Sequence, residues 1–135
     1  MRSLVVDDEL TSRIVLEQIL RSYGEVDCAQ TGTDAVDACQ RALQLGHPYD
    51  VVCMDIMMPG MSGLDALKLI RQDEERFGRT RQQAAKVIMI TGRDDSEIIS
   101  QCFQQLCDAY LTKPIDAADF LGILDCLHPM PQPHS

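Results

Sequence analysis

The chain has 135 residues and a formal net charge of −9, and 45% of its residues are hydrophobic. This length and composition are typical of one globular domain with a core of its own. The negative charge argues against nucleic acid as a direct partner, because phosphate binding depends on clustered Lys and Arg. No apolar run approaches the roughly 20 residues of a membrane span or forms a signal-peptide core. We therefore expect a cytoplasmic protein that does not enter a membrane.

The six cysteines do not form a recognisable framework. They contain no C-x-x-C pair, and several fall on predicted apolar faces. We interpret them as small buried hydrophobic residues in a reducing compartment rather than as metal ligands or disulfide partners. The cysteines are Cys28, Cys39, Cys53, Cys102, Cys107 and Cys126.

The first half of the chain alternates short apolar runs with helical stripes. The runs at 3–6, 25–29 and 51–55 predict strands, and the third reads as buried on both faces because it is apolar up to its final Asp. Helices are predicted after the first two runs; Gly24 ends one, and Gly46 with Pro48 ends the other. Their apolar stripes are Val15, Leu16, Ile19, Leu20 and Tyr23, then Ala35, Ala38, Cys39, Ala42 and Leu43.

The second half repeats this pattern. Ser62 is predicted to cap a third helix, and the polar stretch 73–85 reads as a loop or a frayed helix end. Strands follow at 86–91 and 109–112, with a helix at 96–106 between them and another after them. The inward residues of these three helices are expected to be Gly63, Ala66, Leu67 and Ile70; Ile98, Ile99, Cys102, Phe103 and Leu106; and Phe120, Ile123, Leu124 and Leu127.

Five alternations of strand and helix predict a single α/β domain. Such a pattern calls for one five-stranded parallel sheet with right-handed crossovers and helices on both faces. We assign residues 1–128 to this domain. Residues 129–135, in which every second residue up to Pro133 is a proline, are expected to form an unstructured tail.

Polar residues gather where the predicted strands end. Because the carboxyl ends of parallel strands meet at one edge of the sheet, these side chains are expected to converge there. Converging carboxylates repel and raise one another's pKa, and a hard divalent cation such as Mg²⁺ resolves that conflict. The residues are Asp7, Asp8 and Glu9 after the first strand, Asp55 after the third, Thr91 after the fourth and Lys113 after the fifth.

Together these groups favour phosphoryl chemistry. A magnesium ion, an ammonium and a hydroxyl form an electrostatic clamp for phosphoryl oxygens. A carboxylate inside that clamp is a nucleophile toward phosphorus. Each residue also has an ordinary interpretation, since an acidic pair suits a helix N-terminus, Thr91 could cap a helix and Lys113 could lie on the surface. Their placement at successive strand ends favours the site.

At these residues the chain resembles a known family, the response-regulator receiver domains of bacterial two-component signalling, including the single-domain chemotaxis regulators. The resemblance covers residues 3–127 and implies a flavodoxin-like (βα)5 fold with strand order 2-1-3-4-5. It rests on four motifs: Val5-Val6-Asp7-Asp8, Met54-Asp55-Ile56-Met57-Met58-Pro59-Gly60-Met61-Ser62-Gly63, Ile90-Thr91-Gly92 and Tyr110-Leu111-Thr112-Lys113-Pro114.

The resemblance implies a role for each residue around the phosphate. Asp55 is expected to accept the phosphoryl group, and Thr91 and Lys113 to contact its oxygens. Tyr110 occupies the position of an aromatic switch residue, whose ring turns inward when the hydroxyl residue moves to the phosphate. The bond between Lys113 and Pro114 lies at a position that is commonly cis in the family. The protein is thus expected to be a switch rather than an enzyme, assisting only its own phosphorylation and dephosphorylation.

The resemblance also implies a metal site. Asp8 and Asp55 are expected to bind Mg²⁺ directly, Asp7 through a water molecule and Met57 through its backbone carbonyl. A separate hypothesis concerns the lifetime of the phosphate. Met57 and Arg93 lie two residues beyond Asp55 and Thr91, and their size suggests that they hinder an attacking water.

The expected phosphodonor is a histidine kinase or a histidine phosphotransfer protein, because His47, His128 and His134 read as surface residues. The phosphorylated form would act on a separate protein target or through an output domain outside this chain, and a homodimer on phosphorylation stays open. The fourth helix, fifth strand and fifth helix are the expected signalling surface, whose acidity favours a separate target. Its acidic residues are Glu97, Asp108, Asp116, Asp119 and Asp125.

Three other functional classes fit the sequence less well. A magnesium-dependent phosphatase with an aspartyl intermediate would need a second Asp where this chain has Met57. A flavin or dinucleotide binder would need a phosphate-cradling loop after the first strand, where an acidic pair repels phosphate unless a metal is present. A phosphorylation-independent interaction scaffold with the same fold remains the alternative.

Overall fold

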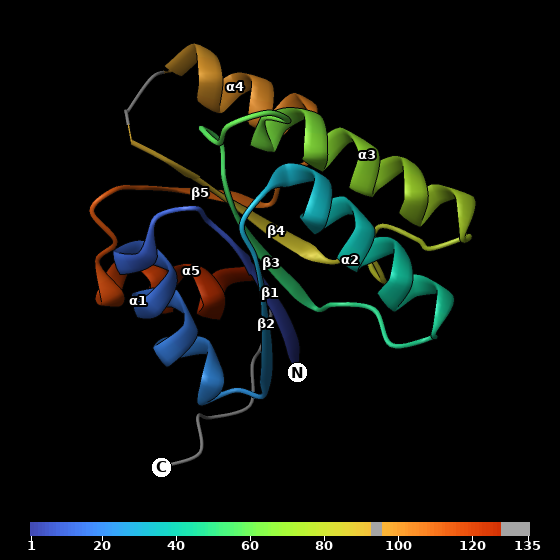
Figure 1. Cartoon of the computed structure of the whole chain (residues 1–135), viewed down its shortest axis with the longest axis horizontal. Coiled ribbons are helices and arrows are strands. Elements are labelled where there is room, and N and C mark those ends of the chain that lie inside the picture. The colour runs from blue at the N-terminus through green and yellow to red at the C-terminus, as the bar shows by residue number, and fades with distance from the viewer. Residues whose placement is uncertain (93–95, 128–135) are drawn as a thin grey trace.

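The computed structural model describes residues 1–92 and 96–127. Within these residues, one sheet of five parallel strands has the order β2-β1-β3-β4-β5, which confirms the flavodoxin-like prediction. Helices α1 and α5 cover one face of the sheet, and α2, α3 and α4 cover the other (Figure 1). The strands are β1 (Arg2–Val6), β2 (Glu25–Ala29), β3 (Val51–Asp55), β4 (Lys86–Thr91) and β5 (Ala109–Thr112). The helices are α1 (Leu10–Arg21), α2 (Gly32–Gln44), α3 (Gly63–Arg76), α4 (Ser96–Gln104) and α5 (Ala117–Leu127).

The sheet separates two hydrophobic cores. Side chains alternate across a strand, so Leu4 and Val6 of β1 belong to the core beneath α2 and α3, while Val5 belongs to the core beneath α1 and α5. Phe120 and Leu124 are fully buried and fix α5 to the second core. Burying such a side chain contributes roughly 1.5–3 kcal/mol. A strand covered on both faces is expected to be largely apolar, and β3 is buried along its whole length, with Asp55 as its one charged residue.

The start of α3 is held tightly against the end of β3. Ser62 is the N-cap, and its hydroxyl accepts a hydrogen bond from the Asp65 amide, as predicted. The Gly63 amide donates to the Ile56 carbonyl at 2.9 Å. A Cβ atom on Gly63 would lie 2.3 Å from the carbonyl oxygen of Asp55. Only glycine therefore lets the helix approach the strand end that carries Asp55.

Helix α3 continues further than the polar sequence suggested. It extends to Arg76, and Asp73 and Glu74 are buried in its last turns. The prediction of a loop or a frayed helix end for residues 73–85 was wrong at 73–76, which belong to the regular helix. The buried Arg71 guanidinium pairs with Glu74 there at 2.7 Å. A paired carboxylate can enter a protein interior that would exclude an isolated one.

Helix α4 differs most from its predicted form. It ends at Gln104, and Cys102 is its buried residue, while Phe103 on the helix and Leu106 beyond it are 45% and 46% exposed. The predicted five-residue inward stripe was therefore wrong for these two positions. Leu106 has a φ of 69°, a left-handed conformation that ends the helix before it could continue.

Three further predictions concern the cysteines, membrane spans and the C-terminal tail. Cys39, Cys53, Cys102 and Cys107 are buried free thiols, as predicted, whereas Cys28 and Cys126 are exposed, contrary to that interpretation. Across 1–92 and 96–127, every helix is too short or too polar to cross a bilayer. The predicted tail at 129–135 lies outside the described residues.

Candidate functional site

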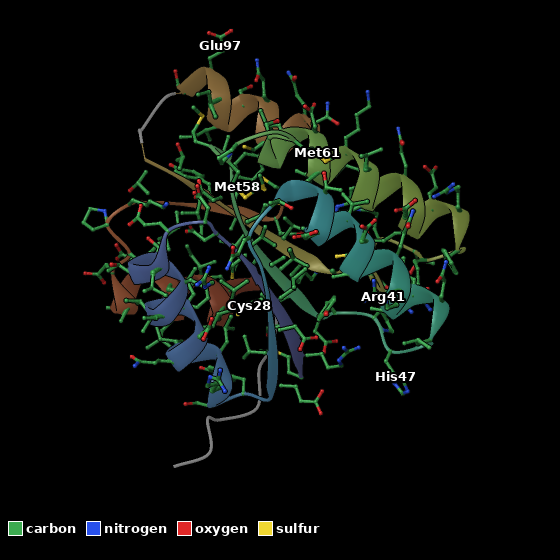
Figure 2. All side chains as sticks on the ribbon, in the orientation of Figure 1. Cys28, Arg41, His47, Met58, Met61 and Glu97 are labelled. Atoms are coloured by element: carbon green, nitrogen blue, oxygen red, sulfur yellow. The ribbon has the colours of Figure 1, made fainter. Side chains whose placement is uncertain are left out.

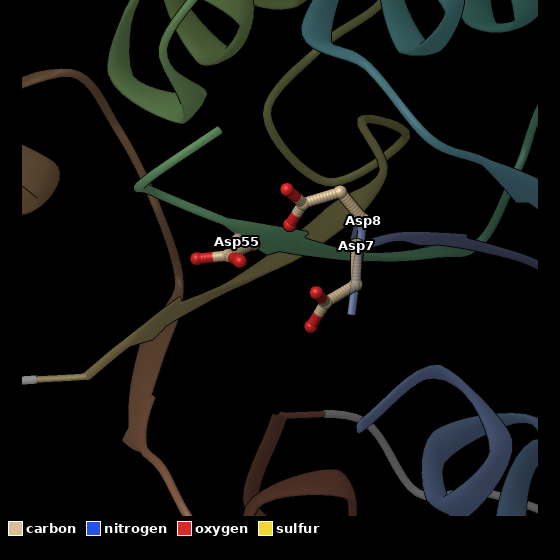
Figure 3. Close-up of side chains that lie close together, drawn as sticks. All are labelled: Asp7, Asp8 and Asp55. Atoms are coloured by element: carbon tan, nitrogen blue, oxygen red, sulfur yellow. The ribbon is translucent and has the colours of Figure 1, made fainter. Parts of the chain in front are cut away.

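Strand pairing brings three carboxylates together at the carboxyl-terminal edge of the sheet. Val6 of β1 pairs with Met54 of β3, so Asp7 and Asp55 follow at neighbouring positions. One carboxylate oxygen from each of Asp7, Asp8 and Asp55 lies within 4.8 Å of the others (Figure 3). Asp7 and Asp55 are buried, whereas Asp8 is exposed at the rim of the cluster. The convergence predicted from the sequence is therefore present.

Lys113 supplies positive charge to this cluster. Its Nζ lies 3.0 Å from Asp55 Oδ2, 3.3 Å from Asp7 Oδ2 and 3.3 Å from Glu9 Oε2. Its backbone amide donates to the Thr91 carbonyl at 2.8 Å, which fixes the lysine at the end of β4. The bond between Lys113 and Pro114 is cis, as the resemblance implied.

The charges in the site shift one another's protonation. Burial, the largest effect, raises the pKa of the Asp7 carboxyl, and the nearby Asp55 raises it further; the Glu9 amide and Lys113 lower it without reversing the shift. Burial lowers the pKa of Lys113, but the attraction of Asp55, Asp7 and Glu9 outweighs it and raises this pKa above its ordinary value. Lys113 therefore stays positively charged, but its charge does not fully offset the effects that raise the pKa of Asp7.

The Asp55 carboxylate is oriented at both of its oxygens. The Met57 amide donates to Oδ1 at 3.1 Å, and Lys113 donates to Oδ2 at 3.0 Å. The Met57 side chain is 72% exposed, and Thr91 at the end of β4 is buried. A nucleophilic carboxylate needs this kind of fixed orientation to meet a phosphorus atom in line.

The donor set fits a hard divalent cation. Asp7 Oδ2 is buried and accepts no hydrogen bond, although Lys113 lies near it, and the three carboxylates carry more negative charge than the lysine can balance. Oxygen ligands and two or three carboxylates are what Mg²⁺ prefers in proteins. The residues assigned to the metal site thus have the chemistry that the ion requires.

The expected switch residue, Tyr110, lies on β5, beside the site. Tyr110 on β5 is 37% exposed, and its ring meets the Phe103 ring of α4 edge-to-face, at 6.3 Å between centroids and 88° between planes. Asp108 does not belong to the acidic surface around it, contrary to prediction, because its side chain is 11% exposed and bonded to Arg71. Glu97 at the start of α4 does point outward (Figure 2).

Other residues singled out from the sequence are not at the site or cannot be placed. His47 is exposed in the segment after α2 (Figure 2). Its carbonyl accepts a hydrogen bond from Arg2 at the start of β1, the opposite end of that strand from Asp7. Arg93, His128 and His134 lie outside the described residues. The contact between Lys113 and Glu9 was not assigned in advance. Its signal was the third acidic residue in the run that follows the first strand.

Comparison with known proteins agrees with this geometry. The family model of the response regulator receiver domain matches residues 3–125. The chain is 36% identical over 125 residues to chemotaxis protein CheY-3 of Vibrio cholerae, covering 93% of this chain and 89% of that protein. The crystal structure of the receiver domain of the histidine kinase CKI1 from Arabidopsis thaliana, complexed with Mg²⁺, superposes with a TM-score of 0.83 at 28% identity, covering 94% of this chain and 91% of that one.

Another relative is much longer, and the match covers only a small part of it. The chain is 34% identical over 125 residues to the sensory/regulatory protein RpfC of Xanthomonas campestris, which covers 92% of this chain but 16% of that protein.

The fold, the site geometry and the family match therefore agree. The chain belongs to the response regulator receiver domain family and is a receiver domain of two-component signalling.

Proposed function

We propose that Asp55 accepts a phosphoryl group from a phosphohistidine on a histidine kinase or histidine phosphotransfer protein. The observation that carries this proposal is the three-carboxylate cluster with Lys113 bonded to the buried Asp55. In the transfer, an Asp55 oxygen forms a bond to phosphorus as the bond from phosphorus to the imidazole nitrogen breaks. The imidazole leaves with the electron pair and takes a proton from water. Hydrolysis of the aspartyl phosphate later returns the carboxylate and releases phosphate.

The residues around Asp55 have separate tasks in this proposal. Asp8 and Asp55 would hold Mg²⁺ directly, Asp7 through a water and Met57 through its carbonyl; the bound ion would offset the carboxylates and the charge of the phosphoryl oxygens. Lys113 is 3.0 Å from Asp55 Oδ2 and would contact the transferred oxygens from there. The Thr91 hydroxyl would donate to another of them. These groups would position the phosphoryl group and neutralise the charge on its oxygens, which is most of what phosphoryl transfer requires.

The proposed readout is a change at the surface of α4, β5 and α5. Movement of Thr91 toward the phosphate would make room for the Tyr110 ring, which now packs against Phe103 at the surface. The target would be a separate protein or an output domain, and a homodimer is a further outcome of the same change. The scaffold alternative is not favoured. A protein that does not use a phosphoryl group would not need these site residues, yet they lie together at one edge of the sheet.

Intact mass tests the proposal. The protein is incubated with acetyl phosphate and Mg²⁺, alongside Asp55→Asn and, as a matched control, Asp65→Asn, which changes an exposed carboxylate on α3. We expect one added phosphoryl group in the wild type and in Asp65→Asn, and none in Asp55→Asn or after removal of Mg²⁺. Phosphorylation of Asp55→Asn at the wild-type rate would assign the acceptor to another residue. No phosphorylation of the wild type at short times would favour the scaffold.

A further inference from the structure

Helix α4 meets the core through the thiol of Cys102 and through the partly buried Ile98. Among the residues of α4, Cys102 is the buried one, and it belongs to the same core as Cys107, which precedes β5. Cys102 is 0% exposed and Cys107 is 5% exposed. The two cysteines therefore lie at the junction where the chain leaves α4 and enters the sheet.

The backbone at this junction brings the two cysteines face to face. The Cys107 amide donates to the Cys102 carbonyl at 3.0 Å, and the Leu106 amide donates to the Phe103 carbonyl at 3.0 Å. With the left-handed Leu106 between them, these bonds form a Schellman motif. In this motif the residue after the left-handed position folds back onto the last helical turn and usually makes an apolar contact there. In this chain the contact is between two cysteines.

The two thiols also affect each other's pKa. Burial raises the pKa of both, to about 12 for Cys107, while the Cys107 side chain is a hydrogen-bond partner of the Cys102 thiol. Cys39 and Cys53 are also buried, but no other thiol acts on either of them in the part of the chain that the structure describes. Because the thiolate is the reactive form, the pair reacts slowly while α4 is docked.

We propose that Cys102 and Cys107 form a reversible oxidation site, in which hydrogen peroxide converts the two thiols into a disulfide that ties α4 to the start of β5. One sulfur, as the thiolate, attacks a peroxide oxygen; the O–O bond breaks, and the hydroxide released takes up that thiol's proton as water. The second sulfur attacks the resulting sulfenic acid, the S–O bond breaks, and a second water forms. Two thiols and one peroxide thus give one disulfide and two waters, and a dithiol reductant reverses the change.

The disulfide would act on the part of the fold that carries the switch residue. Phe103 lies between the two cysteines on the chain, and its ring packs edge-to-face on Tyr110. Tying the end of α4 to β5 would restrict separation of these rings. This consequence rests on the proposed function, whereas formation of the disulfide does not, so the two are measured separately.

The test uses the full chain with Cys28→Ser and Cys126→Ser, which removes the exposed thiols that could join two molecules. This protein is treated with hydrogen peroxide, alkylated under denaturing conditions and analysed by intact mass and peptide mapping. We expect the loss of two hydrogens, a peptide linkage between Cys102 and Cys107, and full alkylation of Cys39 and Cys53. A dithiol reductant should restore alkylation of the pair.

The control variant in the same background is Cys39→Ala, which should still form the linkage. The proposal is overturned if Cys102 and Cys107 of the folded protein remain alkylatable after a peroxide exposure many times longer than the one that oxidises both in the urea-unfolded protein. It is also overturned if the linkage joins another pair, or if Cys102 alone gains oxygen. Phosphorylation by acetyl phosphate is then compared in the oxidised and reduced forms; equal rates would contradict the consequence for Tyr110 while leaving the oxidation site in place.

Discussion

The two edges of the sheet each carry a group of buried charges, and the groups differ in how completely they are satisfied. At the amino-terminal edge, the Arg71 guanidinium donates to the Leu106 carbonyl at 2.9 Å, to the Ala85 carbonyl at 2.8 Å and to Glu74 at 2.7 Å. It also reaches Asp108 at 3.0 Å. All three of its nitrogens therefore have partners.

The carboxylates around Arg71 are equally committed. Glu74 accepts the Ala85 amide at 2.7 Å through its other oxygen, and Asp108 accepts the Val87 amide at 2.8 Å. Arg81 adds a second cation beside Asp108. Nothing in this network is left to bind a further group, so its role is to join α3 to β4 and β5.

At the carboxyl-terminal edge the balance is reversed. Among the described residues, Lys113 is the one cation that forms ion pairs with Asp7, Glu9 and Asp55. Asp7 Oδ2 accepts no hydrogen bond. Buried polar networks that are fully satisfied stabilise a unique fold, and an unsatisfied one signals a missing partner. Both clusters are buried, so the degree to which their polar atoms are satisfied is what differs between them.

The largest expected effect comes from breaking the satisfied network. Arg71→Met leaves Glu74 and Asp108 buried without their cation, and we expect it to lower the free energy of unfolding by about 3–5 kcal/mol. The control Arg81→Gln removes a partly exposed partner of Asp108 and should cost about 0.2–1 kcal/mol. Urea denaturation measures both. Equal, small effects of the two variants would show that the network is not structural.

A smaller effect is expected where α3 meets the strand end that carries Asp55. Gly63→Ala forces a Cβ against the Asp55 carbonyl and should cost about 1–3 kcal/mol, with slower phosphorylation because the carboxylate is displaced. Gly122→Ala in α5 meets nothing within 4 Å. This control should instead stabilise the protein by about 0.5–1 kcal/mol. A Gly63→Ala protein with wild-type stability and phosphorylation would contradict the proposed role of this contact.

A still smaller effect is expected at the carboxyl-terminal edge, when Asp7 loses its charge. Because the pKa of Asp7 is raised on folding, its charged form destabilises the metal-free protein. Asp7→Asn keeps an acceptor for the Glu9 amide and should raise Tm by a few degrees in EDTA at neutral pH. The gain should be complete above the raised pKa and shrink as pH falls toward the ordinary value of 3.8. A lower Tm for Asp7→Asn at neutral pH would argue that the edge is already balanced.

The site was predictable because its signal is local. Asp7, Asp55, Thr91 and Lys113 each follow a short apolar run, and parallel pairing fixes where strand ends meet, so four separate motifs converge without any knowledge of the helices. The strand order followed from the family resemblance, and the alternation of runs predicted only the parallel sheet. The orientation of Asp55 by the Met57 amide could not be seen, because it depends on the backbone of a turn.

The Arg71 network was missed for a different reason. Its partners come from α3, the segment before β4 and the segment before β5, and no sequence window contains them all. The remaining hint was a pair of opposite charges, Arg71 and Glu74, at helical spacing beside Ile70 on the apolar face. The exposure of Phe103 was also hidden, because a stripe of apolar residues does not say where a helix ends.

Thermal unfolding in a Mg²⁺ titration shows whether the carboxylate cluster lacks a cation, because an unsatisfied cluster should bind the ion and a balanced one should not. For the wild type, Tm should rise with the logarithm of Mg²⁺ concentration once the site fills. Asp8→Asn, which removes an exposed carboxylate of the cluster, should lose most of this rise, and Asp65→Asn should retain it. A wild-type Tm that does not respond to Mg²⁺, or an equal response in Asp8→Asn, would contradict the account.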